Sequence, residues 1–233
     1  MLEAFLMAAI AGAMIPLGGW IAAHENIKRD WLRNELRHSV IAFGGGALLS
    51  AVAFVLIPEG DAALGSFAVV GWIVFGAVLM ALVDARLDRS GSHMAQLVAM
   101  LADFIPEAIA LGAVLATDRA AAPLLALMIA LQNLPEGFNA YREQLVGEAE
   151  GPQILRRFCL LAALGPVAAL AGYLLLAELP QVTGALMLSA AGAILYLIFQ
   201  DIAPQTRLEN RHAPALGAVA GFVLGLLGHL LIG

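Results

Sequence analysis

The stretch FGGGALLSAVAFVLIPE (residues 43–59) is apolar for almost its whole length and carries no charge before its final glutamate. A strand of a membrane β-barrel alternates polar and apolar residues over roughly ten positions, whereas a helix that crosses a bilayer is apolar throughout for about 20 residues. The three consecutive glycines and the neighbouring alanines are typical of membrane helices that pack closely. The stretch therefore predicts a membrane-spanning helix with close helical neighbours.

The composition of the whole chain agrees with this prediction. Hydrophobic residues make up 61% of the 233 residues and charged residues only 13%, where a soluble domain carries roughly 25% charged residues. The formal net charge of −6 argues against nucleic acid as a partner, because phosphate binding requires a basic surface. The single cysteine, Cys159, excludes a disulfide within the chain. We predict one all-α integral membrane domain over residues 1–233, surrounded by the lipid bilayer.

Apolar runs of about the length that crosses a bilayer as a helix recur along the chain. They are separated by short polar links, and no link is long enough to divide the chain into domains. The eight runs cover approximately residues 2–23, 39–57, 67–84, 95–117, 121–140, 158–178, 182–202 and 213–232. The sequence thus predicts eight transmembrane helices.

The links differ in charge. Eleven of the twelve Lys and Arg residues lie in alternate links, beginning with the link after the first run, and only Arg119 lies in the other set. Cytoplasmic loops of membrane proteins are enriched in Lys and Arg. We therefore expect a multi-pass protein of the cell (inner) membrane with both its N- and C-termini extracytoplasmic.

Two short motifs place polar groups inside the fourth and fifth runs. DFIPEAIALG begins at Asp103 and QNLPEGFNA begins at Gln132. In each motif a proline follows three positions later and a glutamate four positions later, and these glutamates are Glu107 and Glu136. Residues four apart share one face of a helix, so two adjacent helices bring these four oxygen-bearing side chains together. An ionisable group inside a bilayer is costly and indicates a functional site.

Proline strengthens this interpretation. Pro106 and Pro135 have no backbone N–H, so we expect both helices to bend and the carbonyls of Ala102 and Leu131 to lose their usual partners. Carboxylates, an amide and free carbonyls together are typical of a cation site. The alternative is that the carboxylates are protonated, or pair with one another, and only hold the helices together.

Other polar residues are weaker candidates. Asn133 lies beside Gln132, and Gln200 and Asp201 precede a proline at the end of the seventh run. Gln200 and Asp201 fit either a solvated helix end or an exit path for the ion. We expect Asn139 to lie at a solvated helix end.

These features together resemble the ZIP (Zrt/Irt-like) family of divalent metal transporters over nearly the whole chain. QNLPEGFNA is close to the fifth-span motif of the family, and DFIPEAIALG is similar to a fourth-span His-Asn-x-x-Pro-Glu-Gly motif. FGGGALLSAVAFVLIPE, GAVLMALVDARLDR and AAGAILYLIFQDIAP are similar to its second, third and seventh spans. The resemblance implies eight spans, a homodimer, and alternating access by movement of one helix bundle against another.

The resemblance also implies a metal site. The primary site of the family falls on Asp103, where the family usually has histidine, and on Glu107, Gln132 and Glu136. The second, adjacent metal position of the family falls partly on Phe104 and Gly165, which cannot bind a metal through their side chains. A mononuclear site with oxygen ligands is therefore implied, and such ligands favour manganese or iron(II) relative to a histidine-containing zinc site, although zinc also accepts carboxylates.

The function implied is transport of a divalent metal ion (zinc, manganese or iron) toward the cytoplasm. The metal is the substrate; no other cofactor is expected, and no GxxxxGK[ST] phosphate loop is present. We expect Gln200 and Asp201 to help along the release path. One alternative is a ZIP-like protein that has lost metal transport.

An intramembrane hydrolase is a further alternative. The one His-Glu pair reads HENIK and lacks the second histidine of a zinc protease motif. An aspartyl mechanism needs two membrane aspartates that share a proton, and Asp103 and Asp201 could serve, although Asp201 lies near a helix end. We therefore do not expect an enzyme.

Overall fold

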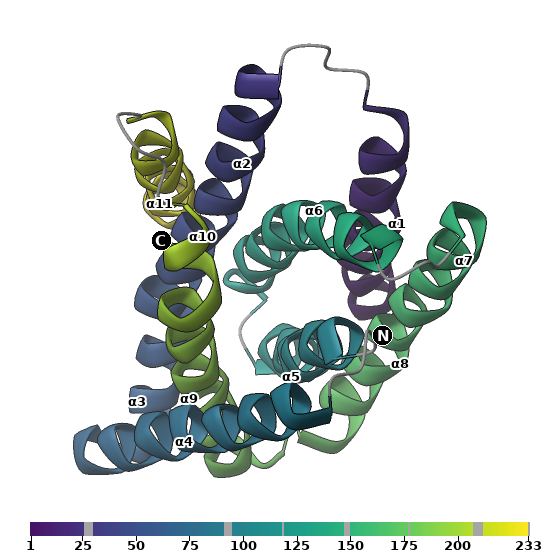
Figure 1. Cartoon of the computed structure of the whole chain (residues 1–233). Helices are drawn as coiled ribbons and strands as arrows, with labels where there is room; N and C mark the ends of the chain where they lie inside the picture. Colours follow the sequence, from purple (N-terminus) through teal and green to yellow (C-terminus); the bar gives the residue numbers. More distant parts are fainter. Residues whose placement is uncertain are drawn as a thin grey trace.

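The computed structural model describes residues 1–25, 30–90, 95–117, 119–146, 150–176, 178–206 and 212–232. Within these ranges the chain is helical and forms no strand (Figure 1). The α-helices are α1 (Leu2–His24), α2 (Asp30–Ala51), α3 (Ile57–Leu64), α4 (Ser66–Ser90), α5 (Ala95–Thr117), α6 (Ala122–Val146), α7 (Gly151–Ala162), α8 (Leu164–Ala171), α9 (Pro180–Leu197), α10 (Ala203–Gln205) and α11 (Ala213–Ile232). The predicted all-α fold is confirmed.

Three π-helical segments interrupt this pattern. η1 (Val52–Leu56) continues α2 into α3, η2 (Gly172–Leu176) follows α8, and η3 (Ile198–Ile202) joins α9 to α10. Each π turn holds one more residue than an α turn, and such turns occur frequently at functional sites. The second, sixth and seventh apolar runs are therefore helical with an irregular turn inside.

Several helical segments have the length and composition of membrane-crossing helices. In the described part of the chain, six helical segments are long and apolar enough to cross a bilayer. They are Leu2–His24, Glu35–Leu64, Ser66–Arg86, Gly151–Leu176, Pro180–Ile202 and Ala213–Leu231. The apolar part of α5 is shorter, at Phe104–Ala116, and α6 contains the polar residues of QNLPEGFNA. The chain is thus a helical protein with several apolar spans, as the composition predicts.

Glycines bring the helices together in pairs. In the described residues, α1 packs on α6, α2 on α11, α4 on α9, and α5 on α8 and η2. Each pair has a glycine on both sides at which an added Cβ would lie only 1.9–2.1 Å from a carbonyl oxygen of the other helix. These glycines are Gly18 and Gly137, Gly46 and Gly221, Gly76 and Gly192, and Gly112 and Gly172. The backbones of each pair are therefore in direct contact, as expected for membrane helices without a hydrophobic driving force between them.

The pairs assemble into two groups. Group A contains α1, α5, α6 and the α7–η2 segment, and group B contains α2–α3, α4, α9–α10 and α11. The groups meet mainly where α2 contacts α6 and where α5 contacts α9 (Figure 1). The two Pro-Glu motifs lie on α5 and α6, the helices of group A that make these contacts with group B.

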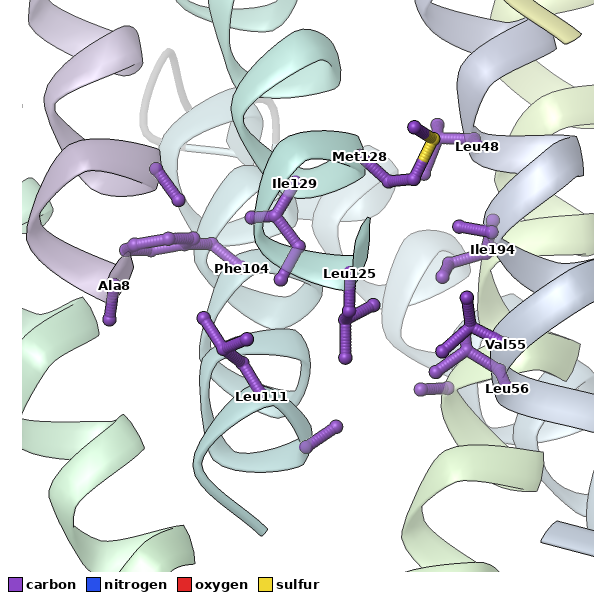
Figure 2. Packing of buried hydrophobic residues seen from close by; sticks show 14 of the residues in the cluster. Ala8, Leu48, Val55, Leu56, Phe104, Leu111, Leu125, Met128, Ile129 and Ile194 are labelled. Carbon is purple, nitrogen blue, oxygen red and sulfur yellow. The ribbon is translucent and has the colours of Figure 1, made fainter. Parts of the chain in front are cut away.

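Large apolar side chains fill the interior between the helices. Figure 2 shows Leu125 and Met128 of α6 opposite Leu48 of α2 and Ile194 of α9. All four are buried. In contrast, α4 exposes most of its apolar side chains, which suits a helix that faces lipid. The core thus connects the groups, and α4 lies at the edge of the bundle.

Two glycines of α4 provide a test of the paired packing. Gly76 contacts the Ser189 backbone, whereas a Cβ at Gly71 would meet nothing within 4 Å. We expect Gly76→Ala to destabilise the protein by roughly 1–3 kcal/mol, because overpacking forces the helices apart. Gly71→Ala is the matched control, and alanine there adds helix propensity without contact. Thermal unfolding of both variants in detergent, followed by tryptophan fluorescence, measures the difference. Equal melting temperatures would contradict the packing account.

Candidate metal centre

Both prolines of the Pro-Glu motifs lie inside continuous helices. Pro106 is within α5 and Pro135 within α6, and Figure 1 shows α6 as an arc. Because Pro135 cannot donate a hydrogen bond, the carbonyl of Leu131 is left without its usual helical partner. Gly44 of α2 provides the space for the proline ring, since a Cβ there would lie 2.8 Å from Pro135 Cγ. The Pro135 ring therefore lies against α2 of group B.

Glu107 and Gln132 join the two motifs. Both side chains are buried, at 2% and 1% exposure. The Gln132 Nε2 group donates a hydrogen bond to Glu107 Oε2, across the contact between α5 and α6. The structure thus brings these two predicted residues together. A buried carboxylate without a partner is strongly unfavourable, so the amide of Gln132 stabilises Glu107 in this position.

Among the described residues, two acceptor oxygens at this point of α6 have no hydrogen-bond partner: one belongs to this pair and the other to the next residue along the chain. They are Gln132 Oε1 and Asn133 Oδ1, and both are buried. The amide nitrogen of Asn133 donates to the carbonyl oxygen of Ala11 in α1 at 2.8 Å, so its oxygen points away from that bond. A buried unsatisfied acceptor costs about 1–3 kcal/mol. Cations bind oxygens of this kind, so the chemistry of these groups fits a metal ion.

A cavity of about 100 Å³ lies between the two groups of helices. Its polar lining consists of Gln132, Glu136 and Asn139 from α6 and Asp201 from η3. A cavity needs only about 10–15 Å³ of space open to water centres to hold one water molecule, so the space is large enough for an ion with part of its hydration shell. The cavity brings Glu136 and Asp201, which are 65 positions apart in sequence, to one space that also contains Gln132.

Two other residues predicted for the site are Gln200 and Asp103. Gln200 is exposed and does not line the cavity. The Asp103 backbone lies in α5, one turn before Glu107, but the Asp103 side chain is outside the described part. Among the described side chains, no three His, Cys, Asp or Glu residues form a metal-binding group.

The π turn explains why Asp201 lines the cavity and Gln200 does not. In an α-helix, the residues three and four positions after Leu197 share its face, and these are Gln200 and Asp201. In the π-helical segment η3 a turn holds about one more residue, so the residues four and five positions later take that face. The cavity is accordingly lined by Leu197, Asp201 and Ile202.

Phe104 and Gly165 pack against each other. Phe104 is buried, and a Cβ added at Gly165 would lie only 2.3 Å from its Cζ atom. Figure 2 shows the ring reaching from α5 toward Ala8 of α1. The ring thus occupies the space that a side chain at position 165 would need. The contact is apolar, and the large side chain of Phe104 is matched by the absence of a side chain at Gly165.

Asn139 was expected at a solvated helix end, and the structure corrects this. It is 7% exposed and lines the cavity one turn after Glu136. Its Oδ1 atom accepts hydrogen bonds from Arg37 Nε at 3.1 Å and Arg37 Nη2 at 2.9 Å. Asn139 lies three positions after Glu136, and this spacing could have indicated that the two residues share one face of α6. Nothing in the sequence indicated Arg37 as the partner of Asn139.

Searches against known protein families and against characterised proteins find no match for this chain.

The Phe104–Gly165 contact predicts coupled effects on stability. Gly165→Ala inserts a methyl group against the ring, and we expect a loss of roughly 1–3 kcal/mol. The same change in a Phe104→Leu background should cost less, because leucine leaves room. Unfolding of the two single variants and the double variant in detergent gives the interaction energy. Additive effects would show that the two residues do not share this space.

Proposed function

We propose that this chain transports divalent metal cations across the cell membrane toward the cytoplasm, as its resemblance to the ZIP family implies. The single observation that carries the proposal is the buried Glu107–Gln132 pair, in which Gln132 lines a cavity and keeps an unsatisfied acceptor oxygen, as does the adjacent Asn133. Polar groups inside a bilayer are expensive and mark ion pathways. A set of buried oxygens without donors is suited to an ion that brings positive charge.

Each residue has a role in this proposal. Glu107, Gln132 and Glu136 bind the ion near the middle of the bilayer, with Asp103 as the fourth ligand. Asn133 supports the site from the α1 side, and Asp201 receives the ion on its way out. The Phe104 ring removes the space for a second ion, so one metal is carried at a time.

The ligand chemistry determines the preferred metal. All four ligands bind through oxygen, and oxygen favours manganese and iron(II) relative to sites that contain histidine. Zinc is also accepted, because zinc binds carboxylates. The transported substrate is thus a divalent transition metal.

The proposed arrangement in the membrane follows from the sequence. All eight apolar runs cross the inner membrane, both termini are extracytoplasmic, and the arginine-rich links face the cytoplasm. The cavity lies between groups A and B, so movement of one group relative to the other exposes the site to each side in turn. Two copies associate as a homodimer in the bilayer.

Metal accumulation in cells tests the function. Cells that express the wild type should gain manganese, iron or zinc relative to an empty vector, measured by elemental analysis. Glu107→Ala and Glu136→Ala should return the metal content to the vector level, because each removes a charged ligand. Glu3→Ala at matched membrane levels is the control, since Glu3 is exposed and its ion pair with Arg119, at 3.9 Å, lies on the surface. If no metal rises with the wild type, the chain is a ZIP-like protein that does not transport metal.

The oxygen-only site predicts a selectivity change. Asp103→His introduces a nitrogen ligand, which suits zinc better than manganese. We therefore expect the ratio of zinc to manganese uptake to rise by roughly tenfold, equivalent to a binding difference of about 1.4 kcal/mol. Uptake from an equimolar metal mixture measures this ratio. An unchanged ratio would remove Asp103 from the ligand set.

A further inference from the structure

Arg37 lies at the boundary between the two groups of helices. It belongs to α2 of group B, and its guanidinium donates two hydrogen bonds to Asn139 Oδ1 of α6 in group A, at 3.1 Å and 2.9 Å. The two residues are 102 positions apart in sequence. The contact is partly buried, and hydrogen bonds from a charged donor in such a place are stronger than those at an exposed surface.

Arg37 is also in line with the cavity. Ile41, Gly44, Gly45 and Leu48 of α2 line it, and they follow Arg37 by four, seven, eight and eleven positions. This spacing defines one face of a helix. Asn139 lines the same cavity from the opposite side. The Arg37–Asn139 contact therefore lies at one end of the cavity. At that end it connects the α2 wall to the α6 wall.

A second arginine provides a contrast. Arg142 of α6 forms an ion pair with Glu25, the residue that follows α1, and α1 and α6 both belong to group A. This pair holds one group together. The contact of Arg37 with Asn139 instead joins α2 to α6, two helices of different groups.

We infer that Arg37 is a positioning residue that clamps α6 to α2 through Asn139 and keeps one end of the cavity closed. Separation of the groups at this end requires both hydrogen bonds to break, so the clamp sets how often the cavity opens there. The guanidinium also places a positive charge at this end, which opposes the passage of a cation until Arg37 moves. Only that last consequence rests on the proposed function.

Thiol labelling of the purified full-length protein tests the clamp without any metal. Cys159 is exposed and is first replaced by alanine. Ile41→Cys then places a thiol one turn from Arg37, at a cavity position whose native side chain is 7% exposed. N-ethylmaleimide should label this introduced thiol slowly when Arg37 is present. Arg37→Gln and Asn139→Leu should each raise the labelling rate by at least about fivefold. Loss of one ordinary hydrogen bond changes the equilibrium between the closed and open cavity by about this factor.

Matched variants separate the clamp from general loosening. Arg142→Gln removes an arginine contact within group A and should leave the labelling rate unchanged, whereas Asn139→Asp keeps an acceptor for Arg37 and should label as slowly as the parent. Rates within about twofold of the parent for both Arg37→Gln and Asn139→Leu would overturn the inference. If neither variant folds, Arg37→Lys replaces them as the test. A lysine lacks the planar two-donor geometry of the guanidinium, so the introduced thiol must be labelled faster in this variant than in the parent.

Transport assays distinguish this inference from the proposed function. Faster labelling of the Arg37 variants together with a wild type that moves no metal would support the clamp and reject the transport proposal. Metal transport by the wild type with unchanged labelling rates would support transport and reject the clamp.

Discussion

Direct backbone contact between helices at glycines is the constraint on which the rest of this structure depends. Lipid tails are as apolar as leucine, so membrane helices gain little by hiding apolar side chains from lipid and must gain stability from close packing. At Gly137 and Gly18 the contact of α1 and α6 is so close that a single Cβ would reach a carbonyl oxygen at 2.0–2.1 Å. This contact fixes α6, and α6 carries most of the polar groups of the cavity.

The polar groups then divide into two sets with different partners. Glu107, Gln132 and Asn133 are held inside group A by contacts among α1, α5 and α6. Glu136 and Asn139 face group B across the cavity, where Asp201 lies. An ion in this cavity would touch residues of both groups, whereas the hydrogen bond between Glu107 and Gln132 lies within group A. The candidate site thus combines a pair held within one group with residues whose separation depends on how the two groups meet.

Sequence patterns predicted the local features and missed the long-range ones. The apolar runs predicted helices, and the four-residue spacing predicted that Glu107 and Gln132 lie on facing sides of two helices. The glycines predicted close packing but not which helices pair, because small residues fit many partners equally well. The Arg37–Asn139 contact was not predictable, since it joins residues 102 positions apart. Gln200 was proposed for the release path together with Asp201, because both precede a proline at the end of the seventh run, but only Asp201 lines the cavity.

The π turn at η3 has a consequence for how this helix tolerates changes in length. A π turn has the same effect as one residue inserted into an α-helix. Loss of one residue within Ile198–Ile202 would therefore be absorbed by conversion of η3 to regular α-helix, without unfolding. If the lost residue lies between Leu197 and Asp201, Asp201 and Ile202 become the residues three and four positions after Leu197, so both keep their place on the cavity face. The irregular turn thus accommodates one residue more than a regular helix would need here, whereas a regular α-helix of the full length would place Gln200 on this face instead of Ile202.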